Sequence, residues 1–543
     1  MSFCTLLYIK IFQKKECDYM NKIYMNGEFI TLENKEIEAI LVENGKIRKT
    51  GTKDEILKLK DDETKIIDLE GKTMMPAFID PHSHFFAVAN SLLQVSLEKC
   101  KSVKEIQDEL LKYKNENHIE EGKWIIACGY DHNILSEKRH ITKKELDEII
   151  PNNPIIIHHK SGHNGVLNSK GLEWLNITKE TIPPFGGKIE KVNDELTGYL
   201  EENAFIEVVK KIPMANLEDL VALCGRAQKK YASYGITTLQ EGMMVKELMP
   251  IYKKLVEDKK LYLDVIVYMD KKAEDEIKEN FKENIKKYKN HFKIGGIKIF
   301  LDGSPQSRTA WMRTPYIDDK EYYGYGTMND EDVKKDVESA YEEKLQILAH
   351  CNGDKAAEQY INAIKSTNKE IEEIRPVLIH GQLLGTDQLK EIKENGIIPS
   401  FFIAHIYHWG DIHIKNFGFE RASKISPAGS AIQNDIKFTF HQDAPVIEPN
   451  MFETIWCAVN RKTKEGKILG EDEKISVLDA IKAVTINSAY QYFEEDYKGS
   501  IKEGKFADLI IVDKNPLKVE KEEIRNIKVL ETIKSGETVW KNG

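Results

Sequence analysis

Runs of apolar, β-branched residues alternate with amphipathic segments through the middle of the chain. This alternation is typical of βαβ units, in which a helix follows each buried parallel strand. Eight strand candidates follow one another, at 77–82, 236–241, 262–269, 296–302, 345–350, 376–380, 397–403 and 437–442. Eight is the number that a (β/α)8 barrel of the TIM type requires, so we predict an α/β fold of this architecture.

The interval between the first two strand candidates, residues 85–235, is too long for a single covering helix. It contains strand-like runs of its own, such as 123–128 and 154–159. We therefore predict a large insertion after the first strand, forming a subdomain at about 95–230.

The two ends of the chain have a different pattern, in which short β-rich runs are separated by turn signals. Residues 22–52 show it first, and 499–515 and 528–543 repeat it. Such spacing is typical of antiparallel sheets. We predict a small β-sandwich formed by both chain ends, 20–75 and 499–543, flanking a barrel at 76–498 and preceded by an extension at 1–19. Met1, Met20 and Met25 are each candidate start positions.

Composition and charge exclude several classes of function. The formal net charge is −10, and no Lys/Arg block lacks interspersed acids, so nucleic acid is not an expected partner. The apolar run 3–12, broken by Lys10, is too short to span a membrane and precedes no cleavage site. The seven scattered cysteines include no CxxC pair, which favours a reducing compartment, and we expect a cytoplasmic protein.

Polar, ligand-capable side chains stand at the ends of five strand candidates. They are His82 and His84 in the first, Lys298 in the fourth, His350 in the fifth, His380 in the sixth and Asp443 in the eighth. The carboxyl ends of barrel strands meet in one pocket, where reactive groups gather. A single histidine there is more often a hydrogen-bonded structural residue. Five concurring strand ends instead predict a divalent metal site, with zinc favoured by imidazole and carboxylate ligands.

Spacing supports the first pair of ligands, whereas Lys298 needs an explanation. Strand alternation places His82 and His84 on one face, where both can hold one ion. A protonated lysine repels a cation, but a buried lysine can lose its proton. The neutral amine can then add carbon dioxide to give a carbamate that bridges two ions. The alternative is an ordinary ion pair between Lys298 and an acid such as Asp302.

Several motifs, in order along the chain, resemble the amidohydrolase superfamily and in particular its amidohydrolase 3, YtcJ-like branch. They are MPAFIDPHSH, GIKIFLDGSPQSRTA, AHCNGDKAAE, LIHGQL, FHQDAPV and GSIKEGKFADLIIVD. Segments of the insertion, GKWIIACGYDHN, PIIIHHKSGHNGVLNS and LTGYLEENA, are similar to that branch as well. The resemblance runs from about residue 22 to the end of the chain.

This resemblance implies a metal-dependent hydrolase that cleaves a carbon–nitrogen bond, a non-peptide amide, in a small molecule by a metal-activated hydroxide. Carried over by position, His82 and His84 hold the first ion, a carboxylated Lys298 bridges, His350 and His380 hold a second ion, and Asp443 is the acid/base residue. We expect His163, Asn168, Asp302, His405 and His408 to contribute to substrate binding, although loop and structural roles explain such residues equally well.

Three departures from the branch leave the substrate open. Ala77 stands where glycine is common, Tyr130 where tryptophan is common, and His441-Gln442 where Gly-Ser is common. One alternative is a mononuclear deaminase, but the position of its catalytic glutamate is Gly353 here. Another is a hydrolase scaffold that acts as a binding or regulatory protein. The sequence is also compatible with a homodimer.

Overall fold

The computed structural model describes residues 21–160, 164–185, 187–212, 216–367 and 373–542. These residues fall into two compact units. The first contains the chain up to Ala87 and resumes at Cys224, and the second is the continuous segment Val88–Leu223. Within the described ranges, no helix is both long and apolar enough to cross a membrane.

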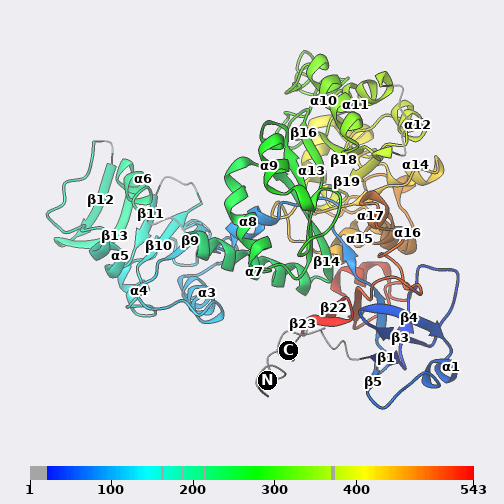
Figure 1. Ribbon diagram of the computed structural model, residues 1–543. Helices are drawn as coiled ribbons and strands as arrows, with labels where there is room; N and C mark the ends of the chain where they lie inside the picture. The colour runs from blue at the N-terminus through cyan, green and yellow to red at the C-terminus, as the bar shows by residue number, and fades with distance from the viewer. Residues whose placement is uncertain (1–20, 161–163, 186, 213–215, 368–372, 543) are drawn as a thin grey trace, which may run out of the picture. The chain divides into compact units, whose positions relative to one another are not determined.

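Eight parallel strands form the central sheet of the first unit (Figure 1). In chain order they are β7 (Phe78–Ile79), β14 (Ile236–Met244), β15 (Asp264–Asp270), β16 (Phe292–Phe300), β17 (Gln346–Cys351), β18 (Val377–His380), β19 (Ile398–Phe401) and β20 (Thr439–Phe440). Each strand pairs in parallel with the next one along the chain. All eight predicted strands overlap an observed one, which confirms the α/β class and the parallel order.

The sheet curls until its first and last strands approach each other at their carboxyl ends. His82, just after β7, has its Nε2 atom 3.5 Å from Oδ1 of Asp443, which follows β20. No backbone ladder joins β20 to β7 in the part of the chain that the structure describes. Side chains from both edges of the sheet therefore share one space without a closing ladder.

Helices alternate with these strands. They are α7 (Leu217–Ser233), α8 (Met249–Glu257), α9 (Glu274–Asn280), α10 (Asp330–Glu343), α11 (Asp354–Ser366), α12 (Thr386–Glu394), α13 (His405–Ala422), α14 (Ala428–Gln433), α15 (Met451–Asn460), α16 (Val477–Ala483) and α17 (Ile486–Gln491). Helix α10 illustrates why they form. The Asn329 side chain caps its first turn by accepting from the Asp332 amide, and acidic residues in that turn oppose the positive end of the helix dipole. Val333, Val337 and Tyr341 recur every four residues and are buried on one face.

Both ends of the chain build two small sheets. The strands are β1 (Lys22–Met25), β2 (Glu28–Phe29), β3 (Ala39–Glu43), β4 (Lys46–Gly51), β5 (Lys65–Asp68), β6 (Thr73–Pro76), β21 (Leu509–Val512), β22 (Val529–Lys534) and β23 (Glu537–Lys541), with the short helix α1 (Lys53–Leu57) between β4 and β5. One sheet has the order β4-β3-β1-β5 and the other β2-β6-β21-β22-β23. One buried cluster includes Ile40 and Ile47 from the first sheet and Leu509 and Ile533 from the second, so the two sheets share a core.

The second unit, described by itself, is a six-stranded sheet with helices. Its strands are β8 (Gln94–Ser96), β9 (Ile125–Tyr130), β10 (Ile155–His159), β11 (Asn164–Leu167), β12 (Gly187–Val192) and β13 (Glu195–Glu202), and its helices are α3 (Val103–Glu116), α4 (Lys143–Asp147), α5 (Ser169–Trp174) and α6 (Asn203–Val209). The order is β12-β13-β11-β10-β9-β8, with β8, β9 and β10 parallel. Leu110, Ile125 and Ile157 are fully buried in its core.

A network of buried charged side chains lies at the amino ends of the central strands. Asp264, at the start of β15, lies 2.6 Å from Lys534 and also pairs with Lys498. Glu494 pairs with Lys498 at 2.9 Å and with Lys293. All five side chains are less than 9% exposed and line a cavity of about 850 Å³. Because buried charges require partners, each acid fixes two lysines.

We predict that Asp264→Asn lowers the free energy of unfolding by about 3–5 kcal/mol, because Lys498 and Lys534 lose a buried counter-charge. Burial alone would raise the pKa of Asp264, but Lys498 and Lys534 hold it well below its usual range. Its contribution is therefore present above about pH 4, the ordinary pKa of an unfolded aspartate, and is lost as the pH falls below that value. Urea unfolding at pH 7 and in acid measures both effects.

The matched control is Asp275→Asn, since the Asp275 side chain is fully exposed. It should leave the free energy of unfolding within about 0.5 kcal/mol of the wild-type value. Equal stability of the Asp264→Asn protein and this control at pH 7 would contradict the interpretation.

Candidate metal centre

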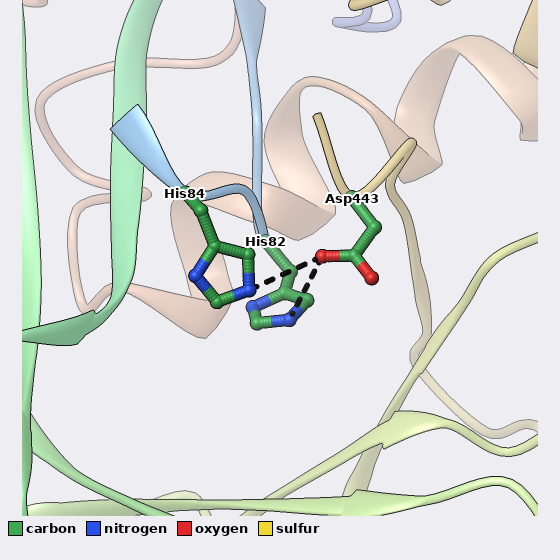
Figure 2. Close-up of side chains that lie close together, drawn as sticks. All are labelled: His82, His84 and Asp443. Atoms are coloured by element: carbon green, nitrogen blue, oxygen red, sulfur yellow. Dashed lines mark ion pairs between the residues drawn. The ribbon is translucent and has the colours of Figure 1, made fainter. Parts of the chain in front are cut away.

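Three side chains converge where the first and last strands of the central sheet end (Figure 2). Nε2 of His84 lies 3.4 Å from Oδ1 of Asp443, and Nε2 of His82 lies 3.5 Å from the same oxygen. The three ligand atoms all lie within 4.8 Å of one another. Ligands about 2.0–2.2 Å from a tetrahedral zinc ion are separated by about 3.3–3.6 Å, so these spacings suit one such ion.

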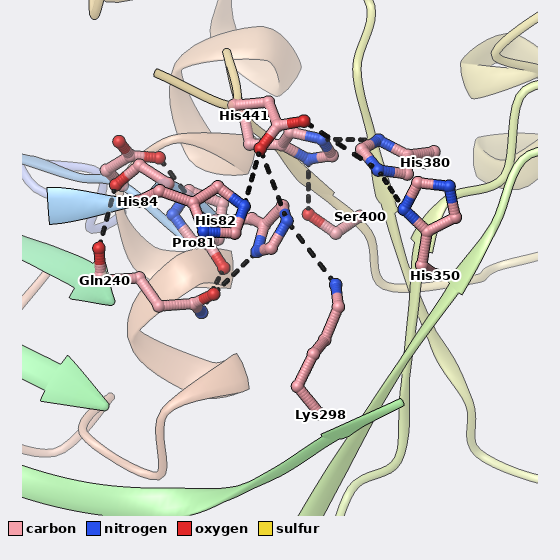
Figure 3. Close-up of polar contacts among 12 residues, drawn as sticks. Pro81, His82, His84, Gln240, Lys298, His350, His380, Ser400 and His441 are labelled. Atoms are coloured by element: carbon pink, nitrogen blue, oxygen red, sulfur yellow. Dashed lines mark hydrogen bonds and ion pairs between the residues drawn. The ribbon is translucent and has the colours of Figure 1, made fainter. Parts of the chain in front are cut away.

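The orientation of His82 is fixed by Gln240 on β14. The Gln240 amide nitrogen donates to the Pro81 carbonyl at 2.7 Å, which turns its oxygen toward Nδ1 of His82 at 2.6 Å (Figure 3). That oxygen can only accept, so Nδ1 carries the proton and Nε2 keeps its lone pair. The lone pair faces Asp443, as a metal-ligating imidazole requires.

Glu241, the next residue on β14, lies behind His84. Its Oε1 is 3.8 Å from Nδ1 of His84, and its Oε2 accepts from the Phe86 amide at 2.8 Å. Burial lowers the pKa of His84, but Asp443 and Glu241 outweigh it and raise that pKa to about 9. Gly242 follows, and a Cβ there would stand 2.7 Å from Cε1 of His82, so only glycine leaves room for the ring.

A second pair of histidines stands beside the first group (Figure 3). Nδ1 of His350 lies 3.1 Å from Nε2 of His380, a separation close to that of two ligands of one ion. The other nitrogen of His380, Nδ1, is 3.1 Å from Nε2 of His441, whose Nδ1 hydrogen-bonds to Ser400. Burial is the largest of the effects that hold the pKa values of His350 and His380 below the usual range, so both rings are neutral.

Lys298 projects from β16 into this group. It is 1% exposed, and its Nζ lies 3.4 Å from Nε2 of His82. Burial lowers its pKa to about 7, although Asp443 opposes the shift. Asp302 is not its partner: within the described residues no ion pair joins them, and the Asp302 carboxylate accepts from the amides of Asn352, Gly353 and Trp311. The ordinary ion pair considered from the sequence is therefore not formed.

Two site residues adopt a left-handed backbone conformation. His380 has φ +76° and Asp443 has φ +54°, both in the left-handed region. Such strain persists only where surrounding contacts impose it, and it concentrates at functional sites. Both residues stand where a strand of the central sheet ends, His380 as the last residue of β18 and Asp443 after β20.

The donor set itself suits a divalent cation. Asp443 Oδ1 is buried and, among the described residues, has no hydrogen-bond donor of good geometry. Burial would raise the pKa of Asp443, but His84, His82 and His380 bring it well below the usual range, so the carboxylate is ionised. An ionised, unsatisfied oxygen between two imidazole nitrogens is the arrangement expected of a cation site.

Comparison with known proteins identifies the family of this chain. A family model described as the amidohydrolase family matches residues 65–540. The chain belongs to this amidohydrolase family. YtcJ of Bacillus subtilis (strain 168), whose amidohydrolase designation is itself provisional, is 27% identical over 540 residues, covering 96% of this chain and 99% of that protein. An N-substituted formamide deformylase of Arthrobacter pascens is 25% identical over 95% of this chain and 97% of its own.

A crystal structure of an uncharacterized metal-dependent hydrolase from Pyrococcus furiosus matches this amidohydrolase as well. It is 27% identical, has a TM-score of 0.70, and covers 92% of this chain and all of its own. Together with the family match, this likeness supports a metal-dependent amidohydrolase.

The other residues expected to bind substrate in this amidohydrolase lie in different parts of the chain and have different surroundings. His163 lies outside the described residues. Asn168 lies in the second unit, fully buried, where its amide bonds to the backbone of residues 150, 153, 155 and 171, a structural arrangement. His405 is buried at the start of α13, with Nδ1 3.1 Å from Nε2 of His413, and His408 lies 2.9 Å from Glu453.

Sequence reasoning missed three residues that support the amidohydrolase centre. Gln240 and Glu241 lie within the apolar strand β14, and Ser400 lies within β19. Their proximity follows from strand neighbours, which the sequence alone does not place side by side. His441 stood out as a departure from the family pattern, and that signal was sufficient to suggest a role near Asp443.

We predict that Gln240→Leu weakens metal binding by about 10–100-fold, because the variant no longer orients His82. Chelator competition measures the affinity. Gln228→Leu is the matched control, since Gln228 is equally buried and bonds only to the backbone of residues 224, 260, 262 and 263. Equal metal affinities of the two variants would show that His82 does not depend on Gln240.

Proposed function

We propose that this protein hydrolyses a carbon–nitrogen bond, a non-peptide amide, in a small molecule. The observation that carries the proposal is the convergence of His82 Nε2, His84 Nε2 and Asp443 Oδ1 beside a buried Lys298. The relative named N-substituted formamide deformylase acts on such a bond by its name, and N-substituted formamides are therefore the first class to screen.

His82 and His84 would hold one divalent ion, and His350 and His380 a second. Lys298 would contribute as a carbamate between them, because its pKa of about 7 leaves much of the amine neutral at neutral pH. Carbamate formation joins the amine nitrogen to carbon dioxide and releases one proton. Divalent ions of the zinc type supply Lewis acidity that polarises a carbonyl oxygen and lowers the pKa of water.

Asp443 would move the proton. Its carboxylate is ionised at neutral pH and can accept a proton from the attacking water as the oxygen–carbon bond forms. The same carboxyl group can donate that proton to the departing nitrogen as the carbon–nitrogen bond breaks.

His405 and His408 would bind the rest of the substrate from α13. The Phe402 and Trp409 rings each lie 4.5 Å from the His405 ring, so this wall is largely aromatic. Burial is the first cause that keeps the pKa of His405 well below its usual range, leaving a neutral ring. An uncharged amide with an apolar substituent fits such a wall better than a charged one.

We predict that Asp443→Asn lowers kcat/KM for the best substrate of an N-acyl and formamide screen by about 10²–10⁴-fold. The amide cannot accept a proton from water. Steady-state kinetics and metal analysis of the same preparation separate lost proton transfer from lost metal. The matched control is Asp435→Asn, at a residue with an exposed side chain and a φ of +51° that asparagine tolerates.

Two outcomes would overturn the hydrolase proposal. One is wild-type protein that binds no divalent metal after loading. The other is an Asp443→Asn variant as active as the control.

We predict that Lys298→Met reduces the bound metal from two equivalents to one or none. The variant should also remove the carbamate carbon resonance that wild-type protein shows in ¹³C NMR after growth or exchange with ¹³C-bicarbonate. Methionine preserves the length and apolar contacts of the side chain. A wild-type protein with full metal content and no carbamate resonance would contradict the role given to Lys298.

A further inference from the structure

The second unit contains a cluster of histidines that the proposed hydrolysis does not use. Strands β9 and β10 are parallel neighbours, and Tyr130 pairs with His159 where both strands end. Asp131 and His132 follow β9 directly, so they lie at the same edge of the sheet as His159. The carboxyl ends of parallel strands are where ligands commonly bind in α/β sheets.

Strand alternation separates the two histidines at the end of β10. The ring of His158 points to the other face and packs 5.1 Å from the Phe205 ring. His159 points to the face where His132 lies. Only one member of the pair is therefore available to the cluster.

Three atoms that can ligate a metal ion lie close together. Nδ1 of His132 lies 3.1 Å from Nε2 of His159, and the same Nε2 lies 3.7 Å from Oδ1 of Asp131. All three atoms lie within 4.8 Å of one another. Two ligands of a tetrahedral zinc ion are about 3.3–3.6 Å apart, and the two measured distances fall on either side of this range.

Neighbouring aromatic rings hold this cluster in place. The His140 ring lies against the His132 ring, with centroids 4.1 Å apart. Nδ1 of His140 hydrogen-bonds to the Tyr130 hydroxyl at 2.9 Å, and Asp131 Oδ1 accepts from the Asn133 amide at 2.9 Å.

We propose that Asp131, His132 and His159 bind a divalent transition-metal ion of the zinc type, with ligands other than His82, His84 and Asp443. Two imidazoles and one carboxylate are a recurring ligand set for zinc and for other first-row metals. Three protein ligands leave a coordination position open for water or a small anionic ligand. His140 and Tyr130 serve as positioning residues for this site.

The test uses the full chain with the barrel centre disabled. In the His82→Ala/His380→Ala variant, each ion position of the barrel loses one ligand. Titration with Co²⁺ should still show one tightly bound equivalent, with the visible absorption bands of a tetrahedral or five-coordinate ion. Adding His132→Ala and His159→Ala should remove that equivalent, and Asp131→Asn should weaken it by at least about tenfold.

The matched control adds His118→Asn to the barrel variant, because His118 is an exposed histidine of the same unit with a φ of +50° that asparagine tolerates. It should leave the bound equivalent unchanged. Far-UV circular dichroism confirms that each variant is folded. The proposal is overturned if the folded barrel variant binds no Co²⁺, or if the equivalent survives His132→Ala/His159→Ala as an adventitious surface ion would.

Discussion

Parallel pairing of strands in chain order is the constraint on which the rest of the structure depends. Because β7 to β20 run in one direction, every strand delivers its carboxyl end to the same edge. Residues as distant in sequence as His82 and Asp443 then meet at 3.5 Å. The buried ion pairs around Asp264 lie at the opposite, amino-terminal edge of the sheet. The candidate metal centre and this stabilising network therefore lie at different ends of one sheet.

The candidate metal ligands are supported by residues of neighbouring strands. Lone imidazoles rotate, and a ligand atom aimed wrongly binds nothing. His82 is held by Gln240, and His380 by His441, each through the ring nitrogen that faces away from the other donors.

The periodicity of the sequence predicted the eight strands, because buried parallel strands are continuous apolar runs that helices interrupt. Their lengths were less predictable. Strand β7 was expected at 77–82 but spans only Phe78–Ile79, since the chain leaves the ladder to present His82 and His84. The candidate ligands could be selected from the sequence because polar residues at buried strand ends are conspicuous. Gln240 could not be selected, because inside β14 it is indistinguishable from any buried polar residue until β14 is placed beside β7.

The side chains of the candidate centre differ in exposure. The side chains of His82 and Lys298 are 1% exposed and that of His380 is 4% exposed, so these residues form the floor. His84 is 26% exposed, and Asp443 and His350 are each 15% exposed, so these three residues are the more accessible members of the candidate centre. His441 and Gln442, the departures from the family pattern, are fully buried, and Gln442 donates to Thr454. These two residues therefore alter the packing behind Asp443 and not the exposed atoms of the candidate centre.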